Sequence, residues 1–143
     1  MAVSPTLAHM LSSAVGTGED FNERMDIVRA VRHGLPAAVV DNLVADGALS
    51  YAEIDRVVLP RKTLAHRKQL GLLTPDQSDR MVRVARIIAD AQDCFGSAEK
   101  AHQWLRRPTA ALAGEVPLHL LDTEEGARAV ETLLLKIGHG IAA

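Results

Sequence analysis

The apolar positions of this chain recur at helical spacing, and no segment shows the strict alternation of apolar and polar residues that strands have. The clearest stripe has spacings of 3, 4, 3 and 4 residues, which keeps it on one helix face for about four turns. It consists of Met81, Val84, Ile88, Ala91 and Phe95. Thr74 before it suits a helix cap, Pro75 suits the first helical position, and Gly96 suits the end. The sequence therefore predicts a long helix from residue 75 to about residue 95.

A second apolar stripe with the same spacings lies near the end of the chain. It consists of Ala127, Val130, Leu134, Ile137 and Ile141, and Leu133 widens it. Thr123 suits the cap of this helix, and Glu124 and Glu125 suit its positive first turn. We expect the helix to run to within a few residues of the chain end.

Shorter helices are predicted between turn signals in the rest of the chain. The predicted ranges are 21–33, 37–46, 51–58, 61–70 and a helix that begins after Ser97. In the first of these, Phe21 and Met25 are expected to share one face. Pro36 suits the first position of the second helix. Ser50 and Glu53 are spaced as a capping box for the third.

These signals predict an all-α fold with three parts, namely a flexible arm at residues 1–18, a helical domain at 19–95 and a small helical module at 96–143. The arm is expected because its residues are small, polar and interrupted by glycine. Aromatic residues make up only 3% of the chain while hydrophobic residues reach 48%, so the core must be aliphatic.

The composition also indicates in which cellular compartment the protein is found. The single cysteine, Cys94, excludes an internal disulfide and a cysteine-based zinc cluster. No apolar run approaches the ~20 residues that span a bilayer. The N-terminus lacks the basic and then apolar pattern of a secretory signal. We therefore expect a cytoplasmic protein with no membrane contact.

Positive charge is concentrated in the middle of the chain, although the formal net charge is only −2. Residues 56–86 contain two acidic residues, Asp76 and Asp79. The basic residues of the same window are Arg56, Arg61, Lys62, Arg67, Lys68, Arg80, Arg83 and Arg86. A local positive patch on a nearly neutral protein indicates an anionic partner.

This positive region coincides with two short predicted helices joined by a tight turn, which is the arrangement of a helix-turn-helix. Residues 50–58 would form the support helix, and residues 61–70 the recognition helix that enters the major groove of DNA. The expected DNA-binding residues are Arg61, Lys62, Thr63, His66, Arg67 and Lys68, because long donors reach base edges and phosphates. Leu64, Ala65 and Leu70 are expected to face inward.

The basic residues also have a simpler interpretation, because a basic helix is often only a solvated face. The lack of any acidic residue between Arg56 and Leu70 favours DNA, since ordinary solvated helices mix charges of both signs. Arg80, Arg83 and Arg86 either extend the track of phosphate contacts or solvate the outer face of their helix. The sequence leaves both alternatives open.

No pattern of catalytic or metal-binding residues is present in the sequence. The six histidines are scattered without ligand spacing. The segment Gly16-Thr17-Gly18 lacks the further glycines and the lysine of a phosphate-binding loop. Cys94 has no obvious base nearby and is expected to be a small core or boundary residue. We therefore expect no enzymatic activity, no metal and no cofactor.

Two segments contain many spaced positions that match one known family. The first reads L-S-Y-A-E-I-D-R-V-V-L-P-R-K-T-L-A-H-R-K and is followed by L-T-P-D-Q-S-D-R-M-V-R-V-A-R. The second reads W-L-R-R-P-T-A-A-L-A-G-E-V-P-L-H-L-L-D-T-E-E-G-A-R-A-V-E-T-L-L-L-K-I-G-H-G-I. They resemble the Xre-like helix-turn-helix half and the toxin-binding domain, respectively, of Xre/MbcA/ParS-type antitoxins from RES–Xre toxin–antitoxin systems. Together they cover roughly residues 48–141.

The resemblance implies a function. Such antitoxins pair with a RES-domain toxin that degrades NAD+ or transfers its ADP-ribose, and their C-terminal region occludes the toxin active site. The family also implies autoregulation at the promoter of its own operon, antitoxin homodimers within a complex with the toxin, and a bacterial cytoplasm. The toxin-binding residues expected on this basis are Trp104, Leu121, Arg128, Lys136, Ile137, His139, Gly140 and Ile141.

The end of the last helix has two interpretations. Lys136 and His139 form a positive tip, loosened by Gly138 and Gly140, which would enter a pocket built for the pyrophosphate of NAD+. Alternatively, the two basic residues only complement the helix dipole. For the whole chain, the alternative is a stand-alone helix-turn-helix regulator whose C-terminal module only dimerises it, and a small enzyme is a more distant one.

Overall fold

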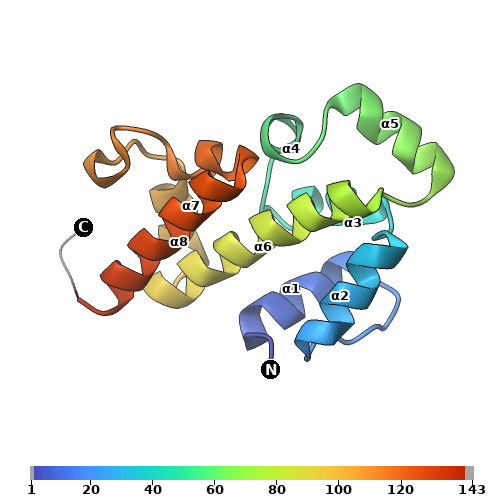
Figure 1. Cartoon of the computed structure of the whole chain (residues 1–143), viewed down its shortest axis with the longest axis horizontal. Coiled ribbons are helices and arrows are strands. Elements are labelled where there is room, and N and C mark those ends of the chain that lie inside the picture. The colour runs from blue at the N-terminus through green and yellow to red at the C-terminus, as the bar shows by residue number, and fades with distance from the viewer. Residues whose placement is uncertain (1, 141–143) are drawn as a thin grey trace.

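The computed structural model describes residues 2–140, which form helices packed around one long central helix (Figure 1). The α-helices are α1 (Pro5–Val15), α2 (Arg24–His33), α3 (Ala38–Ala45), α4 (Tyr51–Val57), α5 (Arg61–Leu70), α6 (Pro75–Phe95), α7 (Ala98–Leu105) and α8 (Glu124–Gly138). Two 3-10 helices, η1 (Ala110–Leu112) and η2 (Pro117–Asp122), lie between α7 and α8. Within residues 2–140, β pairing is limited to isolated bridges, so the predicted all-α class is confirmed. None of the helices described is long and apolar enough to cross a membrane.

The central helix is α6, which begins and ends where the sequence predicts. The Thr74 hydroxyl accepts a hydrogen bond from the Gln77 N–H at 3.1 Å, and the Gln77 side chain accepts one from the Thr74 N–H at 2.9 Å. The predicted stripe is buried except for Phe95, which is half-buried against the Trp104 ring at a centroid distance of 5.6 Å. Helices α1, α2, α7 and α8 all pack on α6.

The flexible arm expected at residues 1–18 is wrong for most of that segment, because α1 is a packed helix. The Ser4 hydroxyl accepts from the Leu7 N–H at 3.2 Å, and Pro5 occupies the first turn. The helix buries an apolar face against α3 and α6. Its members are Leu7, Ala8, Met10, Leu11, Ala14 and Val15. The Asn42 amide of α3 donates to the Ala14 carbonyl at 2.6 Å and joins the two helices.

Helix α2, which the sequence predicts from residue 21, begins later than predicted. Glu23 and Asp26 form a capping box, which starts α2 at Arg24. Phe21 therefore precedes the helix and is buried in the core at 2% exposure, whereas Met25 on α2 is 52% exposed. The prediction that these two residues share a helix face is wrong.

Helix α3 also begins later than predicted. Pro36, expected at its first position, pairs with Leu72 in an isolated bridge, and the helix starts at Ala38. This crossing brings the chain close to itself. Gly34 has a φ of +95°, and a Cβ at this position would lie 2.4 Å from the Leu73 carbonyl oxygen. Only glycine fits there.

In the C-terminal module, α8 begins at the predicted cap, because the Thr123 hydroxyl accepts a hydrogen bond from the Gly126 N–H at 2.9 Å. Gly126 is required because a Cβ there would lie 1.8 Å from the Leu120 carbonyl oxygen of η2. The buried residues of α8 are Ala127, Val130, Leu133 and Leu134, as the second stripe predicts. Ile137 is half-buried, and Ile141 lies outside the described residues.

One hydrophobic cluster connects the two predicted parts of the chain. It extends from Leu7 in α1 to Leu134 in α8 and includes the buried face of α6. The predicted boundary between residues 95 and 96 therefore falls within a continuous core. The division into 19–95 and 96–143 stays a prediction about sequence modules, while α6 supports both parts physically.

Candidate functional site

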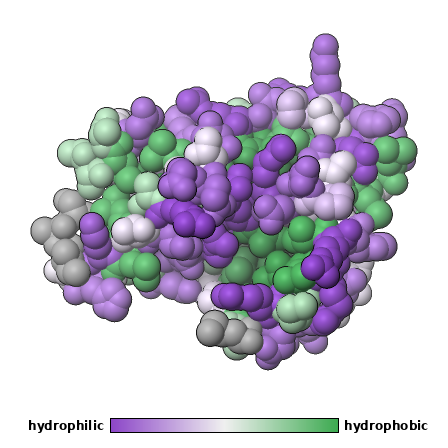
Figure 2. Space-filling model, in the orientation of Figure 1, coloured by the Kyte–Doolittle hydropathy of each residue, from purple (hydrophilic) through white to green (hydrophobic). Residues whose placement is uncertain are grey.

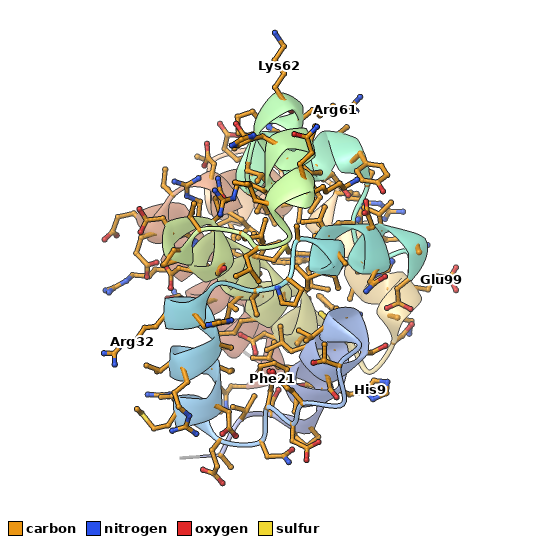
Figure 3. The ribbon with its side chains drawn as sticks, turned by 90° about the vertical axis from the view of Figure 1, so that its right-hand side faces the viewer. His9, Phe21, Arg32, Arg61, Lys62 and Glu99 are labelled. Atoms are coloured by element: carbon orange, nitrogen blue, oxygen red, sulfur yellow. The ribbon has the colours of Figure 1, made fainter. Side chains whose placement is uncertain are left out.

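The predicted helix-turn-helix corresponds to α4 and α5, which are joined by residues 58–60. Pro60 precedes α5 and offers no side-chain acceptor, and the Asp55 carboxylate of α4 accepts from the Arg61 N–H at 2.8 Å instead. This contact ties the start of the recognition helix to the support helix. Figure 3 shows Arg61 and Lys62 at the outer end of α5, where they project away from the body of the molecule.

The recognition helix is held by one buried side chain. Leu64 is 4% exposed and is the buried residue of α5, whereas Leu70 is 58% exposed. Ala65 is exposed as well. The expectation that Leu70 and Ala65 face inward is therefore wrong. Because α5 packs mainly on α4, most of its surface is open to a partner.

The structure divides the predicted DNA-binding residues into two groups. Arg61, Lys62 and His66 are exposed, and within residues 2–140 they have no side-chain partner. Thr63 is half-buried. The Arg67 Nε donates to the Leu72 carbonyl at 2.8 Å, so part of this guanidinium holds the turn that follows α5.

Lys68 is engaged in a small polar cluster with α3 and α4. Its Nζ lies 2.8 Å from the Asp41 carboxylate and 5.6 Å from the centre of the Tyr51 ring. Partial burial acts to raise the pKa of Asp41, but hydrogen bonds from Lys68 and Tyr51 outweigh it and hold that pKa below its usual value. The hydrogen bond to Asp41 raises the pKa of Lys68. A phosphate near Lys68 would therefore compete with an existing carboxylate.

The three arginines of α6 make contacts within the molecule. The Arg80 guanidinium donates to the Val58 carbonyl at the end of α4, at 3.0 Å. Arg83 lies 3.4 Å from Glu124, and Arg86 lies 3.3 Å from Glu131, both acids of α8. Neither alternative from the sequence describes these positions well, since the arginines bridge α6 to its neighbours.

The predicted toxin-binding residues do not all lie on one surface. Leu121 is fully buried at 0% exposure, so its side chain cannot reach a partner in this conformation, and we leave it out of the contact surface. Trp104 is half-buried against Phe95. Arg128 is exposed and pairs with Glu124 at 3.2 Å.

The remaining predicted positions lie at the end of α8. Lys136, His139 and Gly140 are exposed, Ile137 is half-buried, and Ile141 lies outside the described residues. Leu135, which sequence reasoning missed, directly precedes them and is 59% exposed. Figure 2 shows hydrophobic surface among the hydrophilic at this end of the molecule, over η1 and the last turns of α8.

A groove runs between the C-terminal half of α6 and α8. Its lining includes Arg86, Asp90, Asp93, Glu131, Leu135 and His139. Burial, together with the negative charge of Glu131, raises the pKa of Asp90 to about 6. The positive tip predicted from the sequence therefore lies beside an acidic groove. The sequence could not show this, because Asp90 and Glu131 come from helices that are far apart along the chain.

The Cys94 thiol faces α8 and is a poor nucleophile. Its Sγ lies 3.6 Å from the Leu134 carbonyl oxygen, and burial raises the pKa of this thiol, which disfavours the reactive thiolate. Within the described part of the chain, no group of three or more His, Cys, Asp or Glu side chains is arranged to hold a metal ion.

Two family models match this chain, one on each part of the fold. Residues 26–86, which include most of α2, all of α3 to α5 and the first half of α6, match the antitoxin Xre-like helix-turn-helix domain. Residues 90–140, which include the end of α6, α7 and α8, match the antitoxin Xre/MbcA/ParS C-terminal toxin-binding domain. The two matches meet within α6.

Several curated proteins are similar to this chain. A protein named antitoxin Xre from Pseudomonas putida is 36% identical over 116 residues, which cover 80% of this chain and 72% of that protein. A protein of the same name from Photorhabdus laumondii is 34% identical over 114 residues, covering 78% and 77%. A Sphingobium protein named Prs ADP-ribosylating antitoxin is 32% identical over 77 residues, or 48% of each chain.

Proposed function

This chain belongs to the Xre/MbcA/ParS family of antitoxins, and we propose that it neutralises a RES-domain toxin by covering the active site of that toxin. The toxin-binding domain implies a toxin partner. The toxin that we propose degrades NAD+ or transfers its ADP-ribose to a target. The relative named Prs ADP-ribosylating antitoxin supports this class of chemistry.

The observation that carries the proposal is the exposed end of α8 within the toxin-binding domain. Leu135 is 59% exposed there, next to the exposed side chains of Lys136 and His139. A single exposed leucine is common on protein surfaces, but this one lies within the segment that matches the toxin-binding domain, where a partner would cover the leucine while the charges select that partner. We propose this face as the main toxin contact, with Trp104 and Arg128 as further contacts elsewhere on the module.

We further propose that the chain binds the promoter of its own operon as a homodimer in the bacterial cytoplasm. The recognition helix α5 has an open surface with Arg61 and Lys62 at its outer end, which suits phosphate and base contacts in a major groove. A dimer of helix-turn-helix domains places its half-sites about one helical turn of DNA apart. Two half-sites at that spacing upstream of the operon are therefore expected.

Co-expression with the protein encoded next to it tests the proposal. We expect the two proteins to co-purify, the partner alone to consume NAD+ or to attach ADP-ribose to a target, and this chain to suppress that activity at a stoichiometric ratio. If the chain binds DNA but captures no partner, it is a stand-alone regulator whose C-terminal module only dimerises it, and the antitoxin proposal is wrong.

Truncation tests the contribution of the tip. Removing residues 138–143 is expected to weaken neutralisation strongly if the end of the chain enters the toxin pocket. The matched controls are Lys136→Ala and His139→Ala, which remove charge and keep the length. Full neutralisation by the truncated chain would show that the body of α8, and not the tip, blocks the toxin.

A further inference from the structure

The position of the recognition helix depends on the C-terminal module. Helix α5 buries only Leu64 and packs mainly on α4. Helix α4 in turn packs on η2 of the C-terminal module more extensively than on α5. The Arg80 guanidinium of α6 donates to the Val58 carbonyl at the end of α4. Tyr51 of α4 and Lys68 of α5 both contact Asp41 of α3. The C-terminal module therefore supplies the most extensive packing surface for α4, beside these polar contacts from α3 and α6.

One side chain makes most of the polar contacts across this junction. Arg106, directly after α7, donates from Nε to one Glu53 carboxylate oxygen at 2.8 Å and from Nη2 to the other at 2.9 Å. Its Nη2 also donates to the Ala48 carbonyl at 3.1 Å, and its Nη1 donates to the His102 carbonyl at 3.1 Å. Bidentate pairing of this kind restricts both distance and orientation.

The partner carboxylate is itself part of the start of α4. Glu53 accepts from the Ser50 N–H at 2.9 Å while the Ser50 hydroxyl accepts from the Glu53 N–H at 3.1 Å, which confirms the predicted capping box. The side chains of Arg106 and Glu53 are 33% and 16% exposed, so water screens this pair less than a surface pair. Burial acts to raise the pKa of Glu53, but the hydrogen bonds from Arg106 and Ser50, together with the positive charge of Arg106, outweigh it and hold that pKa below its usual value.

We propose that Arg106 is a positioning residue for DNA binding, which fixes α4, and through it α5, on the C-terminal module by its bidentate contact with Glu53. The proposal rests on the DNA-binding function proposed above. Arg106 lies outside the helix-turn-helix, and its contacts face the start of α4 and not α5. Its effect on the operator is therefore indirect, through the orientation of the two helices.

Substitutions that keep the cap while breaking the bridge test this role. Glu53→Gln retains an oxygen that accepts from the Ser50 N–H, because glutamine also serves in a capping box. Arg106→Gln removes the planar guanidinium that donates to both carboxylate oxygens of Glu53, and Arg106→Lys keeps the positive charge without this planar pair of donors. The matched control is Arg107→Gln, since Arg107 is the exposed neighbouring arginine. Operator affinity and amide hydrogen exchange are measured on the full-length chain, with circular dichroism to confirm that each variant is folded.

We expect Arg106→Gln and Glu53→Gln each to weaken operator binding about tenfold, and the double variant to weaken it no further, because both changes remove one shared contact. Arg106→Lys should fall between these variants and the wild type. Amides of α4 should exchange faster in both single variants while amides of α6 stay protected. Arg107→Gln should match the wild type in both measurements.

Two results would overturn the proposal. One is wild-type operator affinity in folded Arg106→Gln, which would limit Arg106 to a stabilising contact. The other is unchanged exchange of α4, which would mean that the bridge does not hold the helix. If the wild-type chain binds no operator, the proposed DNA-binding function fails, and the exchange of α4 still decides whether Arg106 positions it.

Discussion

The proposal that α5 binds DNA is tested most directly by the salt dependence of binding after removal of its two outer cations. Arg61 and Lys62 are exposed at the end of α5 that projects from the molecule, and within residues 2–140 neither has a side-chain partner (Figure 3). Their replacement by alanine should therefore leave the fold intact. It should remove phosphate contacts only.

The size of the effect follows from counterion release. Each phosphate contact adds about 0.9 to the slope of log affinity against log salt concentration on duplex DNA. If Arg61 and Lys62 each neutralise one phosphate, the double substitution removes four contacts from a dimer and lowers the slope by about 3.6. Between 50 mM and 200 mM salt, the affinity difference between wild type and variant should then shrink roughly 100-fold. A monomer would show half that slope change.

Titration of a labelled promoter fragment at several salt concentrations measures the slope. The control is the pair Arg32→Ala and Arg29→Ala on α2, which removes the same charge elsewhere, and Figure 3 shows Arg32 pointing away from α5. Lys68→Ala should lower the slope by less than one full contact, because Lys68 already pairs with Asp41 at 2.8 Å. An equal change in slope for the α2 control would refute the reasoning, since binding would then report general charge and not the surface of α5.

Three further predictions concern α8 and the groove between α6 and α8. Gly126→Ala should destabilise the fold by about 1–3 kcal/mol in thermal unfolding, because its Cβ would lie 1.8 Å from the Leu120 carbonyl oxygen. Gly138→Ala, with open space around the new Cβ, should be neutral or slightly stabilising. Leu135→Ala should leave the melting temperature unchanged and weaken toxin neutralisation about tenfold, whereas Thr132→Ala on the same exposed side of α8 should do neither. Asp90→Asn should raise the melting temperature more at pH 7.5 than at pH 4.5. Since the folded pKa of Asp90 is raised from 3.8 to about 6, the folded state holds the proton more tightly, and the fold loses stability at Asp90 as pH rises through this window, by about 1 kcal/mol after solvent screening. An equal gain at both pH values would contradict this assignment.

The features predicted correctly from the sequence depend on residues that are close along the chain. The cap at Thr74, the cap at Thr123 and the capping box at Ser50 each involve groups within three residues of one another, so their spacing is visible in the sequence. The two apolar stripes are local in the same sense. Helix α1 shows the same signal over a shorter length, but the glycines that follow it favour an arm.

The features that were missed depend on contacts between distant segments. The bond from Arg106 to Glu53 joins residues separated by 53 positions. The acidic groove combines Asp90 of α6 with Glu131 of α8. Local periodicity carries no information on such pairs, because the packing angle of the helices decides which charged residues meet.

The same contacts change the meaning of the positive charge in the middle of the chain. Among the predicted arginines and lysines of α5, only Arg61 and Lys62 have no intramolecular side-chain contact in the part of the chain that the structure describes. Two phosphate contacts provide a slope of only about 1.8 and little affinity at physiological salt. The α5 helix of a single chain would therefore hold DNA weakly by itself. Two recognition helices on one operator would double the contacts that α5 offers, which agrees with the proposed homodimer.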